Sequence, residues 1–298
     1  MLGVPMEKAA GRVVESLGGF YTVALERGAR VVCRGRGRLK KQGRIVVGDE
    51  VEIAYQGGEG VIEAIRPRRS LLERPVVANV DTAVVTMALS RPEPALELLD
   101  RILARAALEG LESLLVWNKA DLVGAEEAEA IVGPYREAGY RCITTSAATG
   151  TGIDALREAL TGRLAVFAGP SGVGKSSLLN LLSPGANQKT QGISEKGRRG
   201  RHTTRAVSLL PLPGGGWIAD APGFSVLSLG PVDPRRIPHL FPDLAALGEG
   251  CRFAGCYHRG EPGCAVKEAV EEGRVDRGRY RRYLAILREV EDAFERRF

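Results

Sequence analysis

The pattern of hydrophobic and polar residues divides the chain into three regions with different rhythms. In the first, residues 1–70, short alternating or β-branched stretches are separated by glycine-rich turns, which is typical of strands. These stretches lie at 12–17, 20–25, 29–34, 47–55 and 60–65. Several short strands this close together predict a small closed barrel of the OB type, with an SH3-like barrel as the alternative.

In the second region, residues 71–229, apolar strand-like runs alternate with helical patterns. Strands are expected at 80–89, 113–118, 141–147 and 164–168, with helices at 95–110, 125–139, 153–160 and 175–182. This alternation predicts a mostly parallel sheet covered by helices on both faces. Pro134 falls inside the second helix and is expected to kink or split it.

The third region, residues 230–298, is proline-rich at first, then rich in Cys and His, then helical and rich in Arg. A multidomain protein is therefore predicted. It would have an N-terminal OB-fold β-barrel (1–70), a central α/β domain (71–229) and a C-terminal, metal-binding α-helical domain (230–298).

Composition supports a globular protein. The chain has 298 residues, of which 44% are hydrophobic and 26% charged, and a net charge of +6. These values exclude disordered, collagen-like and coiled-coil classes. There is no run of eighteen apolar residues and no signal-peptide pattern at the N-terminus, so we expect a cytoplasmic protein without a membrane span.

Basic residues cluster in two segments that contain no acidic residue. Residues 34–44 carry six Lys and Arg, and residues 196–205 carry five. Such clusters are candidate contacts to the phosphate backbone of a nucleic acid, although they are also typical of solvated loops. The barrel is accordingly predicted either to bind RNA or to have a structural role.

A phosphate-binding motif, G-x-x-x-x-G-K-[ST], occupies residues 169–176, between an expected strand and an expected helix. Backbone N–H groups of such a loop face the phosphates, Lys175 would reach the β- and γ-phosphates, and the Ser176 hydroxyl would bind Mg²⁺. A chance glycine-rich turn is the alternative. The predicted contacts are Gly169, Pro170, Ser171, Gly172, Val173, Gly174, Lys175, Ser176 and Ser177.

A second motif indicates which base is bound. Asn118, Lys119 and Asp121 follow an apolar strand, at the edge where α/β sheets bind ligands. The Asp121 carboxylate can accept hydrogen bonds from guanine N1–H and the 2-amino group, whereas adenine would leave it unpaired. Asn118 would tie this loop to the phosphate loop, the Lys119 stem would cover the base, and Ser146-Ala147 would give a backbone N–H to guanine O6.

The remaining guanine-nucleotide motifs follow the phosphate loop. Asp220 and Gly223 form an Asp-x-x-Gly motif at a strand end, and Thr203 and Thr204 lie where a GTPase closes over Mg²⁺. An ordinary GTPase begins with the phosphate loop and ends with the base motif. Here the base motif comes first, so the chain is predicted to be a circular permutation of that fold.

On these motifs the sequence resembles the circularly permuted, small-ribosomal-subunit-dependent GTPases of the RsgA (YjeQ) family. The resemblance rests on NKAD, TSA, GPSGVGKSS, GRHTTR and DAPGF, and covers nearly the whole chain. It implies an OB-fold, a permuted GTPase domain and a zinc-binding domain. It also implies GTP hydrolysis stimulated by the small (30S) subunit and its rRNA, late in that subunit's maturation.

Hydrolysis needs charge neutralisation and an oriented water. Lys175, Mg²⁺ and the loop amides supply the first. Phe224, which occupies the place of the usual glutamine, cannot orient water, and the resemblance implies His202 in this role; a loop or RNA-facing residue is the alternative. The resemblance also favours Thr204 over Thr203, together with Ser176, as the magnesium ligand.

Cys251, Cys256, His258 and Cys264 provide three sulfurs and one imidazole within fourteen residues. This set suits one structural zinc ion, with unliganded thiols as the alternative. Cys33 and Cys142 are expected to be ordinary strand residues. The Arg-rich terminal helix is expected to pack on the domain or to contact ribosomal RNA.

The sequence therefore predicts a GTP hydrolase as the leading one of three function classes. A non-hydrolysing, guanine-nucleotide-switched RNA-binding module would share every binding motif. A small-molecule kinase would share only the phosphate loop, and the base motif argues against it. GTP or GDP and the small subunit are the expected partners of a monomer that binds no membrane.

Overall fold

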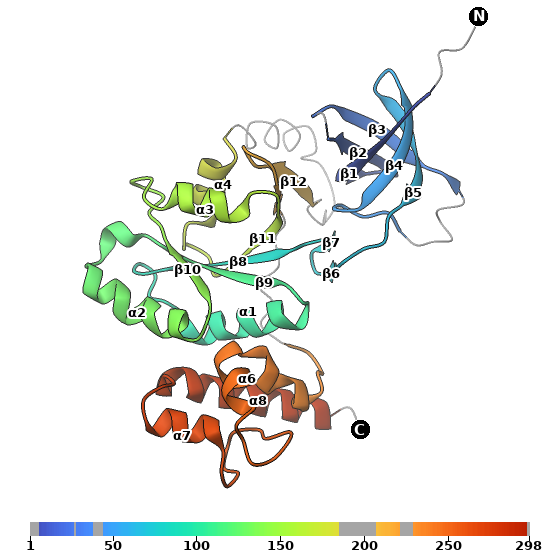
Figure 1. Ribbon diagram of the computed structural model, residues 1–298. Helices are drawn as coiled ribbons and strands as arrows, with labels where there is room; N and C mark the ends of the chain where they lie inside the picture. The colour runs from blue at the N-terminus through green and yellow to red at the C-terminus, as the bar shows by residue number, and fades with distance from the viewer. Residues whose placement is uncertain (1–5, 27, 38–43, 185–206, 221–228, 297–298) are drawn as a thin grey trace, which may run out of the picture. The chain divides into compact units, whose positions relative to one another are not determined.

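The computed structural model describes residues 6–26, 28–37, 44–184, 207–220 and 229–296. The chain forms two compact units, each assembled from segments distant in sequence (Figure 1). The first unit comprises Met1–Thr82, Arg157–Phe167 and Leu179–Phe224. The second comprises Ala83–Leu156, Ala168–Leu178 and Ser225–Phe298.

Five strands of the first unit close into a barrel. They are β1 (Glu7–Leu17), β2 (Phe20–Leu25), β3 (Arg30–Gly35), β4 (Glu50–Gln56) and β5 (Glu59–Ile65). β1 pairs with both β2 and β4, and β3 runs parallel to β5, which gives the closed order β1-β2-β3-β5-β4. The predicted OB-type barrel is confirmed. Its core is aliphatic and includes Val13, Val23, Val51, Ile53 and Ile62.

A buried carboxylate fixes the chain where it enters β4. Asp49 is fully buried and accepts hydrogen bonds from the Val46 N–H at 2.8 Å and from Arg68 Nε at 2.7 Å. Because the guanidinium pairs with it, this buried charge is compensated. The adjacent Gly48 has φ +92, and a Cβ there would lie 2.0 Å from the Ala78 carbonyl oxygen.

The first unit also contains several short strands. β6 (Leu71–Glu73) and β7 (Val76–Ala78) form a hairpin. β11 (Leu164–Ala168) runs parallel to β13 (Trp217–Asp220), which pairs antiparallel with β12 (Ser208–Pro211). β12 meets the barrel at one position, where Ser208 lies opposite Glu15 in β1.

The strands and helices that the sequence predicts to alternate are present, most of them in the second unit. They are β8 (Thr82–Ala88), α1 (Leu96–Leu108), β9 (Glu112–Asn118), η2 (Ala120–Leu122), α2 (Ala125–Glu137), β10 (Arg141–Thr144), α3 (Ile153–Leu160) and, after β11, α4 (Lys175–Leu182). β9 and β10 are parallel. Pro134 does not split α2, because the helix continues past it and the Pro134 carbonyl accepts the Ala138 N–H, while a kink there stays a prediction.

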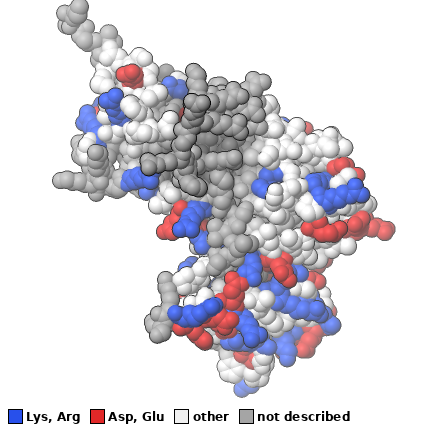
Figure 2. Space-filling view, turned by 180° about the vertical axis from the view of Figure 1, so that it is seen from behind, with Lys and Arg blue, Asp and Glu red and all other residues white. Residues whose placement is uncertain are grey.

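The C-terminal part of this unit is a small helical cluster. It consists of η3 (Pro234–Leu240), α6 (Pro242–Gly248), α7 (Ala265–Glu271) and α8 (Arg277–Glu295). Ile237, Phe241, Tyr283 and Ile286 belong to its core. Figure 2 shows basic and acidic side chains interspersed over the surface of these helices.

One buried arginine joins α8 to the rest of the second unit. Arg279 is 1% exposed, and it donates to Asp100 in α1 at 2.9 Å and to Asp243 in α6 at 3.0 Å. Its guanidinium also lies over the rings of Tyr135, Tyr140 and Phe241. Arg282 also binds Asp100, at 2.5 Å, so two arginines of the terminal helix serve the packing on the domain that the sequence predicts.

Among the described residues, no helix has the length and apolar character that crossing a membrane requires. The division into domains at residues 70 and 229 stays a prediction.

We predict that Arg279→Met lowers the free energy of unfolding by about 3–5 kcal/mol, because Asp243 loses the Arg279 guanidinium and the fully buried Asp100 keeps only Arg282. Burial raises the pKa of Asp100 even beside Arg279 and Arg282. Without the Arg279 guanidinium the pKa of Asp100 should rise further, so the folded state should take up a proton at Asp100 at a higher pH than the unfolded chain does. The difference in unfolding free energy between the variant and the wild type should therefore become smaller as the pH falls from 8 to 5.

Urea denaturation of the full chain at both pH values measures this effect. Arg281→Met is the matched control, since Arg281 is exposed on the same helix, and its effect should stay within about 0.5 kcal/mol. Equal losses for the two variants would contradict the assigned role of Arg279.

Candidate functional site

The loop at 169–174 connects β11 directly to α4. Gly169, Gly172 and Gly174 have φ values of +131°, +81° and +96°, a region that favours glycine. A Cβ at Gly169 would lie 2.1 Å from the Thr86 carbonyl oxygen in β8, so the loop starts in close contact with this strand. The strand–loop–helix arrangement predicted for the phosphate motif is confirmed.

Asn118 joins the base motif to the phosphate loop. Its Nδ2 donates to the Val173 carbonyl oxygen at 2.8 Å. Its Oδ1 accepts from the Ala147 N–H at 3.1 Å and from Thr145 Oγ1 at 3.2 Å. The side chain is 1% exposed, so every hydrogen bond it makes forms out of water. Three segments that are distant in sequence therefore meet on one amide, as the sequence predicts for the first two.

Gly174 packs against the same amide. A Cβ at this position would lie 2.2 Å from Asn118 Nδ2. Both the backbone conformation and the close approach exclude any larger residue here. Glycine is thus required at this position by contact with Asn118 at the end of β9 as well as by the turn itself.

Lys175 opens α4 with its amine turned back over the loop. Nζ donates to the carbonyl oxygens of Gly169 at 2.8 Å and Pro170 at 2.5 Å. Burial lowers the pKa of this amine. Ser176 and Ser177 follow on the exposed first turn of α4, and Ser171 is exposed in the loop. The ammonium therefore sits at the mouth of the loop, where an anion would meet it together with backbone N–H groups.

The base motif presents its carboxylate to solvent. Asp121 is exposed, and its Oδ1 accepts from Ser146 Oγ at 2.5 Å. Ser146 itself is 1% exposed, and the Ala120 N–H donates to the Thr145 carbonyl oxygen at 3.0 Å. The serine hydroxyl fixes the orientation of the carboxylate and leaves its remaining acceptor positions for a ligand.

Lys119 adopts a conformation that is uncommon for a residue with a side chain, with φ +64°. Its Nζ donates to the carbonyl oxygen of Arg91, in the loop after β8. Sequence reasoning missed this loop, although a proline-rich stretch directly after a buried strand, at 90–94, is a signal for one. Lys119 thereby links the base motif to a segment beside the phosphate loop.

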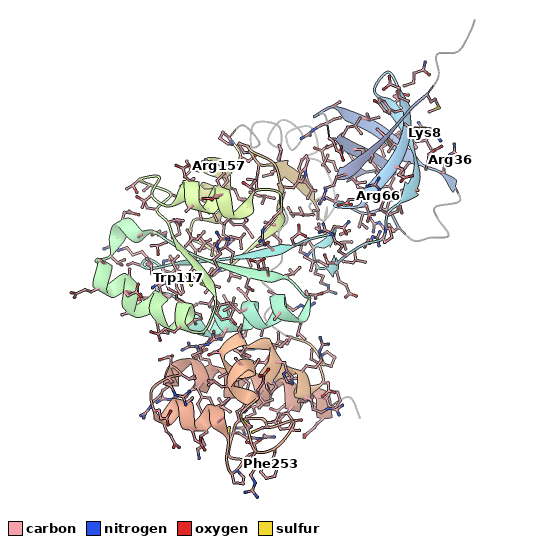
Figure 3. The ribbon with its side chains drawn as sticks, in the orientation of Figure 1. Lys8, Arg36, Arg66, Trp117, Arg157 and Phe253 are labelled. Carbon is pink, nitrogen blue, oxygen red and sulfur yellow. The ribbon has the colours of Figure 1, made fainter. Side chains whose placement is uncertain are left out.

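Trp117, the residue before Asn118, anchors β9 in the interior (Figure 3). It is 1% exposed, and its ring centroid lies 5.5 Å from that of Tyr135 in α2. The phenol of Tyr135 accepts a hydrogen bond from Arg282 at 3.3 Å. Tyr135 therefore packs against the residue before the base motif and also contacts α8.

Several predicted site residues lie outside the described residues. These are His202, Thr203, Thr204, Gly223 and Phe224. Asp220 is the last residue of β13, and the sequence predicts this motif at a strand end.

The predicted metal ligands lie together in the C-terminal cluster. One ligand atom from each of Cys251, Cys256, His258 and Cys264 lies within 4.8 Å of all the others. Cys251 Sγ is 3.9 Å from Cys264 Sγ, and His258 Nδ1 is 3.6 Å and 3.5 Å from these two sulfurs. A tetrahedron with metal–sulfur bonds near 2.3 Å has edges of about 3.8 Å, so this donor set fits a zinc ion.

Hydrogen bonds to a carboxylate and from two tyrosines fix the turn that carries His258. His258 has φ +60°, a strained conformation for a β-substituted residue. The Glu261 carboxylate accepts from the N–H groups of Tyr257, Arg259 and Gly260 at 2.7, 2.9 and 3.0 Å. Tyr280 and Tyr283 of α8 donate to the carbonyl oxygens of His258 and Tyr257.

The barrel, the permuted order of the nucleotide motifs and the Cys₃His cluster define a circularly permuted GTPase. A family model described as RsgA GTPase matches residues 64–230, and one described as RsgA N-terminal domain matches residues 10–62. The chain belongs to the RsgA GTPase family.

Relatives named small ribosomal subunit biogenesis GTPase RsgA match almost end to end. The protein from Moorella thermoacetica is 50% identical, with 94% of this chain and 97% of the relative covered. That from Caldanaerobacter subterraneus is 44% identical, with coverage of 98% and 99%.

Two solved structures are also similar. YjeQ from Thermotoga maritima has a TM-score of 0.82 at 36% identity, with 95% of this chain and 99% of that chain covered. YloQ, described as a circularly permuted GTPase, has a TM-score of 0.81 at 33% identity, with 96% of both chains covered.

We predict that Gly174→Ala destabilises the nucleotide-free chain more than Gly172→Ala does. Both glycines have positive φ, which costs about 1–2 kcal/mol for alanine. Only at Gly174 would the new Cβ also displace the Asn118 amide, whereas at Gly172 its nearest neighbour would be Pro92 at 3.8 Å. Urea denaturation compares the two directly, and equal losses would contradict the contact with Asn118.

Proposed function

We propose that this protein is a GTPase that hydrolyses GTP to GDP and phosphate during late maturation of the small (30S) ribosomal subunit. Membership of the RsgA GTPase family supports this proposal, as do near full-length relatives named for small ribosomal subunit biogenesis. The single observation that carries it is the hydrogen bond between Asn118 Nδ2 and the Val173 carbonyl oxygen. That bond joins the motif proposed to read the base directly to the loop proposed to bind the phosphates.

Selection of guanine rests on Asp121. Its carboxylate, oriented by Ser146, accepts from guanine N1–H and the 2-amino group, and the Ala147 N–H, which donates to Asn118 Oδ1 in the free protein, would be shared with guanine O6. The stem of Lys119 covers the base while its amine stays bound to Arg91. Adenine offers neither of the two donors and would leave the carboxylate unpaired.

Phosphates bind along the loop from Gly169 to Ser177. In the free protein Lys175 Nζ is held by two loop carbonyl oxygens, and phosphate oxygens would share this amine when the nucleotide enters. Ser176 and Thr204 would hold Mg²⁺, which neutralises developing charge on the phosphates when bound. The exposed Ser176 hydroxyl suits an oxygen-ligated cation.

The remaining requirement is a residue that orients the attacking water. Phe224 follows the Asp220-x-x-Gly223 motif and cannot orient water, so we assign that role to His202. Thr203 and Thr204 lie next to it in sequence, and Thr204 is the residue that closes over the metal. We expect hydrolysis to be slow in the absence of the ribosomal subunit and to be stimulated when the subunit binds.

The Cys₃His cluster holds one structural zinc ion. Four protein ligands close the coordination sphere, so the metal carries no reactive water and serves folding. The helices before and after the 251–264 loop, α6 and α7, have seven residues each, and the ion would link this loop to their core.

We further propose a division of labour along the chain. Residues 1–70 form an RNA-binding barrel, 71–229 the GTPase domain and 230–298 the zinc domain. The basic segments 34–44 and 196–205 would contact phosphates of the rRNA. The protein would act as a cytoplasmic monomer that binds no membrane.

The decisive test of this function is phosphate release from GTP by the purified full-length chain, with and without isolated small ribosomal subunits. We expect the subunits to raise the rate by one to three orders of magnitude, the size of effect that completing a GTPase site produces. Nucleotide-dependent subunit binding without any hydrolysis would instead identify a binding switch. His202→Ala should lose the stimulated rate while it retains GTP affinity.

We predict that Asp121→Asn weakens GTP binding about 100-fold, because it removes two charge-assisted hydrogen bonds. Xanthine carries a carbonyl where guanine has the 2-amino group, so an amide at this position can donate to it. The variant should therefore bind xanthosine triphosphate more tightly than GTP. Displacement of a fluorescent nucleotide measures both affinities, and unchanged GTP binding would contradict the assignment of Asp121.

We predict that the wild-type chain contains about one zinc ion and that Cys264→Ala loses it, together with several kcal/mol of stability in the C-terminal helices. Cys142→Ala is the matched control, because Cys142 lies in β10, outside the cluster. Elemental analysis and hydrogen exchange measure the two effects. Zinc retained by the Cys264 variant would contradict the ligand set.

A further inference from the structure

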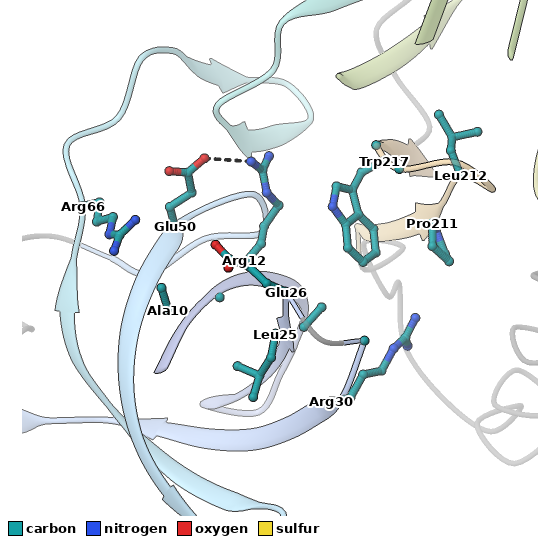
Figure 4. A pocket seen from close by; sticks show the side chains of 15 residues that line it. Ala10, Arg12, Leu25, Glu26, Arg30, Glu50, Arg66, Pro211, Leu212 and Trp217 are labelled. Carbon is teal, nitrogen blue, oxygen red and sulfur yellow. Dashed lines mark hydrogen bonds and ion pairs between the residues drawn. The ribbon is translucent and has the colours of Figure 1, made fainter. Parts of the chain in front are cut away.

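A cavity of about 530 Å³ lies within the first unit, between the barrel and the β12–β13 hairpin (Figure 4). β1, the end of β2 and the start of β4 line one side, and the hairpin residues 211–217 line the other. Its volume falls within the range of about 300–1,000 Å³ typical of ligand sites. None of the nucleotide or metal ligands lines it.

The cavity combines an aromatic ring, an apolar wall, the guanidinium groups of Arg12, Arg30 and Arg66, and the carboxylates of Glu26 and Glu50. Trp217 is half-buried, and its indole projects from the hairpin toward the barrel (Figure 4). Leu25 and Pro211 contribute apolar surface. The floor holds Arg12, which is ion-paired with Glu50 at 2.7 Å. This pair is compensated internally and gives the floor no net charge.

The rim carries arginines whose own ion pairs are weak. Arg30 lies 3.5 Å from Glu15, and Arg66 lies 3.7 Å from Glu52. Both arginines are exposed, and ion pairs of this length in solvent contribute at most about 1 kcal/mol. Their guanidinium groups are therefore free to exchange these carboxylates for phosphate oxygens.

An indole face flanked by guanidinium groups matches the chemistry of unpaired RNA, whose bases stack on aromatic rings while the backbone phosphates meet arginines. An acidic peptide would satisfy the arginines but would leave the indole without a planar partner. We propose that this cavity is a subsite for one unstacked nucleobase of single-stranded RNA, with the base on Trp217 and the neighbouring phosphates at Arg30 and Arg66. The inference rests on the proposed function, which supplies RNA as the partner.

The position of Trp217 connects this subsite to the nucleotide motifs. Trp217 begins β13, the strand that ends at Asp220, so about 10 Å of strand separates the two residues. The Trp217 N–H donates to the Arg163 carbonyl oxygen at 2.7 Å, next to β11, which leads into the phosphate loop. A base stacked on the indole would thus contact the strand that ends at Asp220, the first residue of the Asp-x-x-Gly motif.

The test compares Trp217→Leu and Trp217→Phe with the wild-type full-length protein in binding to isolated small ribosomal subunits at fixed salt. Loss of the stacking surface should weaken binding of the leucine variant about 5- to 150-fold. The phenylalanine variant keeps an aromatic face and should stay within about threefold. GTP affinity and basal hydrolysis should be unchanged in both.

Fluorescence gives a second readout. The chain has two tryptophans, and Trp117 is buried, so quenching by a single-stranded hexaadenylate probe should occur in the wild type and disappear in Trp217→Phe. Wild-type subunit affinity in the leucine variant, or no quenching, would overturn the subsite. If the wild-type protein itself neither binds nor responds to subunits, the proposed function fails, which is a separate result.

Discussion

The amide of Asn118 is the contact on which the candidate site depends. It sits in the interior and binds the phosphate loop through Val173 and the Ser146–Ala147 turn through Ala147. Because the amide has no water to replace a lost partner, displacing any of the three segments leaves a buried polar group unpaired. The base motif and the phosphate loop, the two ends of the candidate nucleotide site, are therefore joined through a single side chain.

The C-terminal helices are held by two different means. The Cys₃His cluster can fix the 251–264 loop by metal coordination, and Arg279 fixes α8 by pairing with Asp100 and Asp243. Apolar burial alone provides less in such a small cluster. The aromatic contacts of Tyr135 then connect α8 to Trp117, immediately before the base motif.

Sequence patterns predicted the elements that have strong periodicity or punctuation. The barrel strands, the phosphate loop and the Cys/His cluster each carry a local signal, namely alternation, glycine spacing or ligand spacing. The role of Arg279 could not be predicted, because a buried arginine and an exposed one look alike in an Arg-rich helix. The Arg91 loop was missed for a related reason, since its contact with Lys119 uses a backbone oxygen that any residue could supply.

One physical claim underlies the whole account: the base motif and the phosphate loop bind opposite ends of one guanine nucleotide. Equilibrium displacement of a fluorescent GDP analogue from the purified chain, by GTP and by ATP, tests it most directly. The account predicts that ATP competes at least about 100-fold more weakly than GTP, because Asp121 finds no donors on adenine. Equal displacement by ATP and GTP would contradict it.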